Sequence, residues 1–429
     1  MAAGSLLAAK VEGLLTVDYY GSAKVVESAV RALRELLIRL SVTQVSAASA
    51  SGPIHQGPWV FKKRKCSRIG KVEFAVLHYG GASQGRWHGV FLDILHDIVN
   101  YLVHYCKALD ATQKLSWDAS NWFLFNDRHT TSTPEGKENF ENFKLIMRMV
   151  INFPLKLPGT AYTVGMKART ALMAYFRKLI DERRGSTESV YFAALLAGRD
   201  DPDCREQLKD FDDNVLAENI FLLNFTAHDT NSMTLLWILK FLVDYPDVFR
   251  RLQAEQQEIL NSKDRSVKGL RLTWEDMRKM VYRHKFLREL QRFISLVPAN
   301  FAEANEDVKF GDYLIPKGWM VITLTNVIHN DPANYPDLSF NPDRFDVIPK
   351  PFTYLPFSGG PHMCPGIEFA MLVGCIFIHH ITTTYMHDER AGRDKGLEYD
   401  GFFPRPKGGY PINFRAGKFC VFLLQCVRV

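Results

Sequence analysis

The chain has 429 residues, of which 47% are hydrophobic and 23% are charged, and its formal net charge is +6. This composition predicts a globular protein with a sizeable core, and the charge excess is too small to indicate nucleic-acid binding. The seven cysteines are scattered and form no CxxC pair, so the pattern indicates neither a disulfide scaffold nor a zinc site.

Residues 1–115 contain no recognisable motif. Residues 1–20 lack a cationic start and an uninterrupted apolar stretch, so they predict neither a signal peptide nor a transmembrane anchor. The small-residue tract Ser46–Gly52 predicts a flexible segment, and the basic run Lys62–Lys65 predicts a solvated face. We therefore separate a divergent N-terminal region, residues 1–115, from a second region, residues 116–429.

The sequence pattern of the second region predicts a series of helices and a short extended part. Apolar spacing, caps and stops predict helices over Met166–Arg184, Asn214–Asp244, a segment opened by Thr273 as N-cap with Asp276 in the capping-box position, Arg283–Leu296 and Ile367–Thr382. Extended segments are predicted over Val308–Ile315 and Met320–Leu324, with a turn at Pro316–Gly318 between them. The fold class is therefore mainly α with a small β part.

The predicted helix Asn214–Asp244 is strongly apolar except for a polar patch in its middle, Thr226–Ser232, which argues against a membrane span. Asp229 and Thr230 lie in that patch. An acid beside an alcohol inside an apolar helix is costly unless both are satisfied, so the pair is a catalytic candidate. The alternative is that Thr230 bonds back to a carbonyl one turn earlier.

A tight loop delivers a thiol to the start of the last predicted helix. The segment from Phe357 to Gly366 holds two adjacent glycines and a proline ahead of Cys364, with a proline and a glycine after it. Backbone N–H groups and the positive end of a helix are expected to lower the pKa of such a thiol and to favour metal ligation. The alternative is a buried structural cysteine at a helix start.

This loop resembles the haem-binding loop of the cytochrome P450 superfamily. Its residue sequence is similar to that of the plant clan that oxidises brassinosteroids, gibberellin precursors, abscisic acid and triterpenoids. The matching positions are Phe357, Gly360, Cys364, Pro365, Gly366 and Ala370. The resemblance implies a P450-like helical fold around haem b, with Cys364 as the metal ligand to the iron. It also implies that the other cofactor-binding residues are Phe357, Gly360, His362, Gly366 and Ala370, although His362 stands where arginine is usual.

Two further segments resemble the family in the same order along the chain. Glu289 and Arg292 form an ExxR pair, and Arg344 lies in a segment similar to the one that supplies the family's second arginine. The resemblance implies a structural triad of these residues beneath the haem loop. It also implies that Thr230, helped by Asp229, carries protons to dioxygen at the haem.

Two apolar segments match places where the family lines its substrate cavity. The implied pocket residues are Val297, Pro298, Ala299 and Phe402, and plain core packing is the alternative. The usual cations for the haem propionates are less evident, because Ala302 stands in one arginine position and a Trp-x-x-x-Arg motif is not found. Low haem affinity is therefore an open alternative.

By resemblance, residues 116–429 form a haem-thiolate monooxygenase domain. It would hydroxylate a lipophilic terpenoid- or steroid-like substrate with O2 and with electrons from NADPH, which enter through an NADPH–cytochrome reductase. The implied location is the cytosolic face of the endoplasmic reticulum, where peripheral membrane contact would attach the chain. The alternatives are a catalytically silent homologue that binds haem or a lipophile, and a helical protein in which Cys364 is merely structural.

Overall fold

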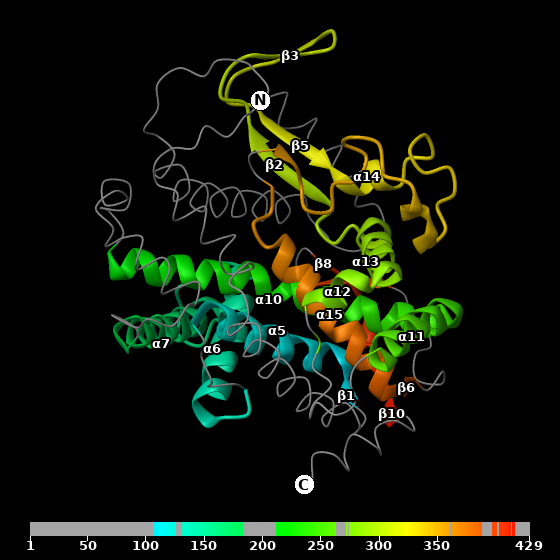
Figure 1. Cartoon of the computed structure of the whole chain (residues 1–429). Coiled ribbons are helices and arrows are strands. Elements are labelled where there is room, and N and C mark those ends of the chain that lie inside the picture. Colours follow the sequence, from blue (N-terminus) through cyan, green and yellow to red (C-terminus); the bar gives the residue numbers. More distant parts are fainter. Residues whose placement is uncertain are drawn as a thin grey trace, which may run out of the picture.

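A computed structural model describes residues 106–125, 131–182, 212–262, 272, 274–360, 363–387, 397–400, 403–412 and 414–416 (Figure 1). The helices are α5 (Ala108–Phe125), α6 (Pro134–Ile151), α7 (Ala161–Glu182), α10 (Asp213–Asp244), α11 (Pro246–Asn261), α12 (Trp274–Lys279), α13 (Val281–Ile294), α14 (Thr325–His329) and α15 (Ile367–Thr384). The strands are β1 (Cys106–Lys107), β2 (Ala299–Glu303), β3 (Val308–Phe310), β4 (Tyr313–Ile315), β5 (Met320–Leu324), β6 (Tyr385–His387), β7 (Leu397–Asp400), β8 (Phe403–Pro406), β9 (Pro411–Ile412) and β10 (Phe414–Ala416). The expected fold class, mainly α with a small β part, is confirmed.

Helix α10 runs through the middle of the molecule, with α5, α6 and α7 on one side and the β2–β5 sheet on the other (Figure 1). It begins where the Asp212 carboxylate accepts a hydrogen bond from the Val215 N–H at 2.8 Å, an N-cap that satisfies one free helix donor. It ends at Asp244, ahead of Pro246. No helix in the described part of the chain meets the length and hydropathy needed to span a membrane.

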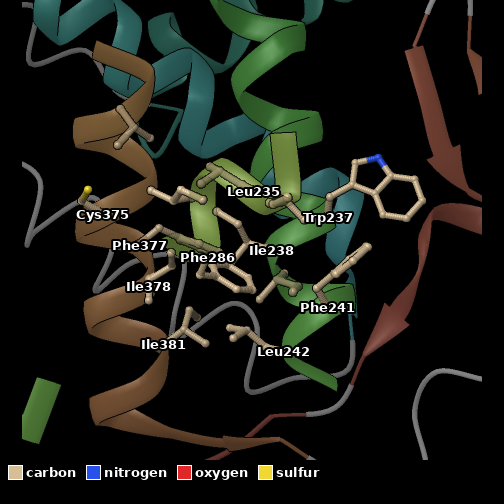
Figure 2. Packing of buried hydrophobic residues seen from close by; sticks show 14 of the residues in the cluster. Leu235, Trp237, Ile238, Phe241, Leu242, Phe286, Cys375, Phe377, Ile378 and Ile381 are labelled. Carbon is tan, nitrogen blue, oxygen red and sulfur yellow. The ribbon is translucent and has the colours of Figure 1, made fainter. Parts of the chain in front are cut away.

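The main core lies where α10, α13 and α15 meet (Figure 2). Ile238, Phe286 and Ile378 are fully buried there. Burying each such side chain stabilises the fold by about 1.5–3 kcal/mol relative to leaving it in water. Gly374 of α15 permits a close approach, because a Cβ at that position would lie 3.2 Å from a methyl carbon of Leu287.

A second core joins α5, α6, α7 and the first half of α10. Trp117, Phe143 and Phe176 are among its fully buried residues. Helices α6 and α7 are in close contact at Gly165, where an added Cβ would overlap the Cβ of Met149. Glycine is therefore favoured at this crossing, since any larger residue would force Met149 or one of the two helices to shift.

The small sheets differ from the expected strand pairing. The segment Val308–Ile315, expected as one extended run, is a hairpin of β3 and β4 that folds at Gly311, whose φ is +61°. The turn at Pro316–Gly318 is present, since Trp319 N–H donates to Pro316 O at 3.1 Å. It leads into β5, which pairs with β2, a strand that the sequence interpretation had not singled out.

Most predicted helix boundaries lie within a few residues of the observed ones. Helix α7 begins five residues before Met166, and α13 ends at Ile294 because Ser295 adopts a left-handed conformation. The predicted N-cap Thr273 lies outside the described residues. The boundary placed at residue 115 falls inside α5, and the division into two regions stays a prediction.

Candidate active site

Cys364 lies in the loop before α15, and hydrogen bonds between backbone groups of this loop hold its conformation. The Cys364 N–H donates to Phe357 O at 2.9 Å, and the Met363 N–H donates to Gly360 O at 3.2 Å. Gly360 has a φ of +71°, in the region that favours glycine. His362 lies outside the described residues. The loop therefore fixes the position of the cysteine relative to the helix that follows.

The Cys364 thiol is half-buried at the head of α15. Burial raises its pKa above the ordinary value, and the hydrogen bond from the Gly366 backbone N–H lowers it by less. The expectation that the loop itself lowers the thiol pKa is therefore wrong, because desolvation outweighs the single backbone donor. A metal ion bound to the sulfur would supply the missing stabilisation of the thiolate.

The residues after the cysteine connect it to α15. The Ala370 N–H donates to Gly366 O at 2.9 Å, which places Ala370 in the first turns of the helix. Phe369 packs against Phe123 of α5 with ring centroids 4.8 Å apart. The start of α15 is therefore held from the direction of α5 as well as by the loop.

The structure brings the ExxR pair and the second arginine together. Arg292 donates to both carboxylate oxygens of Glu289, at 2.8 and 2.7 Å, and both side chains are fully buried. Arg344 lies 3.4 Å from the same carboxylate, which also accepts the Asn341 N–H at 3.0 Å. A buried carboxylate with this many donors is satisfied, so the predicted triad exists as a contact set.

His329, which the sequence interpretation missed, joins the triad to the cysteine loop. Its Nε2 accepts the Leu355 N–H at 2.9 Å, and its Nδ1 lies 2.8 Å from the Ser295 hydroxyl. Arg292 donates to the carbonyl of His329 at 2.9 Å. A single histidine near a sheet carries no periodic signal, so only the folded arrangement identifies it.

On α10, the Thr230 hydroxyl donates to Thr226 O at 2.8 Å, the back-bond expected of a mid-helix threonine. Thr226 and Thr234 make the same type of bond one turn before and one turn after. The three threonines are four residues apart and share one face of α10. Asp229 is adjacent and partly buried. The back-bond accounts for the hydroxyl hydrogen but leaves the oxygen lone pairs available.

The predicted pocket residues Val297 and Pro298 lie in the link between α13 and β2, and Ala299 begins β2. Val297 and Phe301 expose 38% and 47% of their surface. Backbone contacts hold the wall, since the carbonyl of Val297 accepts the Thr325 hydroxyl and that of Pro298 accepts the Asn326 N–H. Ala299 pairs with Leu324 across β2 and β5. Phe402 lies outside the described residues.

Several known proteins are similar to this chain. Abscisic acid 8'-hydroxylase 2 of Arabidopsis thaliana is 36% identical over 310 residues, which are 72% of this chain and 62% of that protein. Abscisic acid 8'-hydroxylase CYP707A1 of Solanum lycopersicum is 35% identical over 277 residues, 64% of this chain and 56% of that protein. The chain thus spans about three fifths of the length of these curated relatives.

The fold has a solved counterpart. Retinoic acid-bound cyanobacterial CYP120A1 superposes with a TM-score of 0.69 and 23% sequence identity, covering 84% of each chain. At this identity the likeness concerns the fold alone. The sequence pattern described as Cytochrome P450 matches residues 105–413, well over half of the chain. The chain belongs to the cytochrome P450 family.

Proposed function

We propose that the chain is a haem-dependent monooxygenase that hydroxylates a lipophilic terpenoid- or steroid-like substrate. O2 is the co-substrate, and the electrons come from NADPH through a reductase. The observation that carries the proposal is the Cys364 thiol, half-buried and bonded to the Gly366 N–H at the head of a buried helix. A thiolate that is held rigidly and is partly shielded from solvent is a suitable ligand for a haem iron.

Cys364 and the residues around it fit a bound haem b. Cys364 would hold the haem iron through its sulfur, and Phe357, Gly360, His362, Gly366 and Ala370 would be the other residues that bind the cofactor. The Gly366 backbone N–H donates to the sulfur, and a Cβ at that position would be in ordinary van der Waals contact with Sγ, 3.7 Å away. When bound, haem supplies the redox chemistry that activates dioxygen.

The α10 residues would handle the protons. Thr230 would hold a proton at its Oγ1 on the face that it shares with Thr226, and the Asp229 carboxylate would resupply that proton from the adjacent position. The lone pairs that the back-bond leaves available support this role for Thr230. Positioned proton donors of this kind accelerate reactions by about 10²–10⁴-fold.

The pocket wall supports an apolar substrate. Val297, Pro298 and Ala299, with Phe402 from the C-terminal part, would line it, and the exposed apolar surface at Val297 and Phe301 would be covered by a lipophilic ligand. The matched relatives are named abscisic acid hydroxylases, so a terpenoid acid is the first substrate to try.

The proposed reductase partner would dock through basic side chains. Arg278 and Lys279 are exposed in the last turn of α12 and carry the required charge for an acidic partner surface. From the family resemblance, the proposed location is the cytosolic face of the endoplasmic reticulum, with peripheral membrane contact.

The carbon monoxide difference spectrum of the reduced protein tests ligation. A strongly red-shifted Soret band is expected for wild type and is lost in Cys364→Ala. An unchanged spectrum in Cys364→Ala would contradict the assignment of Cys364 as the iron ligand. Turnover is then measured with abscisic acid as the probe, NADPH and a plant cytochrome P450 reductase.

A catalytically silent haem- or lipophile-binding homologue is the second candidate. The observation that favours it is Ala302, an exposed position of β2 where the family resemblance expects a propionate-binding cation. Ala302→Arg and His362→Arg should each raise haem retention, because each restores a fixed cation for a carboxylate. Equal haem content in wild type and both variants means that other residues already hold the propionates. A thiolate-type spectrum without turnover of any probe supports the silent candidate.

A further inference from the structure

Three of the most exposed large apolar side chains in the described part of the chain lie in one short stretch, residues 347–352. Val347, Ile348 and Phe352 expose 75%, 88% and 80% of their surface. The stretch follows the 3-10 helix η1 (Pro342–Asp346) and precedes the cysteine loop. Apolar side chains that are exposed together, rather than singly, mark binding surfaces. This stretch is therefore a candidate docking surface.

Two prolines restrict the backbone of the stretch. Pro349 and Pro351 fix their own φ angles, and each limits the residue before it, here Ile348 and Lys350. A segment restricted in this way loses less conformational entropy when a partner binds it. The apolar side chains are thus presented on a preorganised backbone.

The stretch ends in a turn whose third residue is strained. The Thr353 N–H donates to the carbonyl of Lys350 at 3.2 Å. Pro351 is the second residue of this turn, and Phe352 is the third, with a φ of +63°. Proline followed by a positive φ defines a type II turn, which favours glycine or asparagine at the third position. A bulky aromatic residue in this conformation is an outlier that costs folding free energy.

Neighbouring side chains hold the turn in place. The Tyr335 hydroxyl donates to the carbonyl of Thr353 at 2.9 Å, and the Thr353 hydroxyl donates to that of Lys350 at 2.8 Å. One residue further on, the Tyr354 hydroxyl donates to the Gln291 side chain of α13 at 3.0 Å. Strain persists where the surrounding structure determines the backbone in this way. These bonds do not use the Phe352 ring, so the ring itself is not needed to form the turn.

The turn lies close to the cysteine loop. Phe357 follows Phe352 by five positions, so their Cα atoms are no more than about 18 Å apart. The carbonyl of Phe357 accepts the Cys364 N–H at 2.9 Å. A protein that delivers electrons to a group bound at Cys364 must dock nearby, because electron transfer slows steeply with distance. The exposed stretch lies in the part of the chain where such a partner would bind.

The charged groups beside the stretch favour an acidic partner. Lys350 is exposed within it. Arg288 of α13 is also exposed, and its guanidinium lies 5.7 Å from the centroid of the Phe345 ring. The acid Asp346 is paired with Lys285. Lys350 and Arg288 therefore give the edge of the apolar stretch a positive charge, which an acidic protein surface complements.

We propose that residues 347–352 are the apolar centre of the surface that binds the electron-donating reductase, with the Phe352 ring as the main contact. This inference rests on the proposed monooxygenase function and adds an apolar contact to the basic side chains of α12. The strained turn holds the ring in a fixed position. A few rigid side chains, aromatic ones above all, contribute most of the binding free energy of a typical interface.

The first experiment measures strain and uses no partner. Phe352→Asn places a residue that tolerates positive φ in the turn, so the urea midpoint of unfolding should rise above that of wild type. Ile348→Ser removes an exposed side chain of ordinary backbone conformation and should leave the midpoint nearly unchanged. A Phe352→Asn midpoint at or below that of wild type would contradict the argument that the turn retains an unfavourable residue for binding.

The second experiment measures the Kd of the full chain for a plant cytochrome P450 reductase. Phe352→Asn should weaken binding by about tenfold, and Ile348→Ser should weaken it by a smaller factor. Phe310→Asn is the matched control, because Phe310 of β3 is a phenylalanine outside the stretch that exposes 71% of its surface. It should bind as wild type does. Unchanged binding in Phe352→Asn, or an equal loss in Phe310→Asn, overturns the proposal.

The remaining outcomes separate this inference from the proposed function. A wild type without a thiolate-type carbonyl spectrum or without turnover contradicts the proposed function. The docking surface stands in that case if the reductase binds wild type more tightly than Phe352→Asn, and it falls otherwise. Vesicles of phosphatidylcholine and phosphatidylserine are the probe for a lipid surface. If Phe352→Asn loses vesicle binding but keeps reductase binding, the stretch contacts a membrane and the proposal is wrong.

Discussion

The imidazole of His329 accepts a hydrogen bond from the Leu355 N–H, 2.9 Å away, and so connects α14 to the irregular segment that leads into the cysteine loop. For Nε2 to accept, the ring must be neutral with its proton on Nδ1. The Ser295 hydroxyl beside Nδ1 donates in turn to Arg292 O at 3.0 Å. A neutral histidine therefore links the ExxR helix to the loop that presents Cys364.

This link predicts an acid-sensitive stability. Burial and the Arg292 charge lower the pKa of His329 to about 4. The unfolded chain binds the proton near the ordinary value of 6.5, so the contribution of His329 is full above pH 6.5 and is lost as pH falls toward 4. The loss is about 2–3 kcal/mol of unfolding free energy, measured by urea titration across that range.

The control is His329→Gln, in which an amide oxygen accepts the Leu355 N–H without titrating. It should be less stable than wild type at pH 7 and lose less between pH 6.5 and 4. His228 and His284 also have lowered pKa values. The effect of His329 is therefore the difference between the unfolding free energies of wild type and His329→Gln at each pH. Parallel pH curves would show that His329 does not titrate in this way.

Glu289→Gln should destabilise the protein by about 3–5 kcal/mol, because it leaves Arg292 buried without its counter-charge. Asp343→Asn is the matched control. Asp343 accepts two hydrogen bonds from Arg251, at 2.7 and 2.8 Å, but that pair is exposed and should contribute within about 1 kcal/mol. Equal losses in denaturant titrations would contradict a special role for burial.

Gly165→Ala should cost about 1–3 kcal/mol, since the new Cβ overlaps Met149 at the α6–α7 crossing. The gain of about 1 kcal/mol in helix propensity offsets only part of that cost. In Gly374→Ala the new Cβ meets the flexible end of Leu287 at 3.2 Å, so the two effects should nearly cancel. Thermal melts of both variants check the contrast, and it fails if Gly165→Ala is the more stable of the two.

The sequence predicted those features that local patterns encode. Helix α10 was predicted within one residue because its apolar run has clear ends at Asp213 and Asp244. The pairing of β2 with β5 was missed, since Ala299–Glu303 has neither alternation nor a turn signal linking it to its partner. Non-local contacts such as His329 with Leu355, and the balance of burial over backbone donors at Cys364, depend on the completed packing.

Substitution of Thr230 tests the proposed proton delivery by α10. Thr230→Ala removes a hydroxyl whose hydrogen is bonded to Thr226 O, and haem content and substrate binding should be unchanged. Product formed per NADPH should fall, with the lost electrons appearing as peroxide, and an effect approaching the 10²–10⁴-fold range of acid catalysis would be easily seen.

Thr234→Ala is the matched control for this change. It removes the same type of back-bond one turn further along the same helix, where Thr234 donates to Thr230 O at 2.8 Å. If the threonine matters only as a helix-backbone bond, both variants should behave alike, because each loses one hydroxyl of equal geometry. If Thr230 holds the transferred proton, Thr230→Ala alone uncouples NADPH oxidation from product. Coupling in Thr230→Ala equal to that of wild type would remove Thr230 from the reaction.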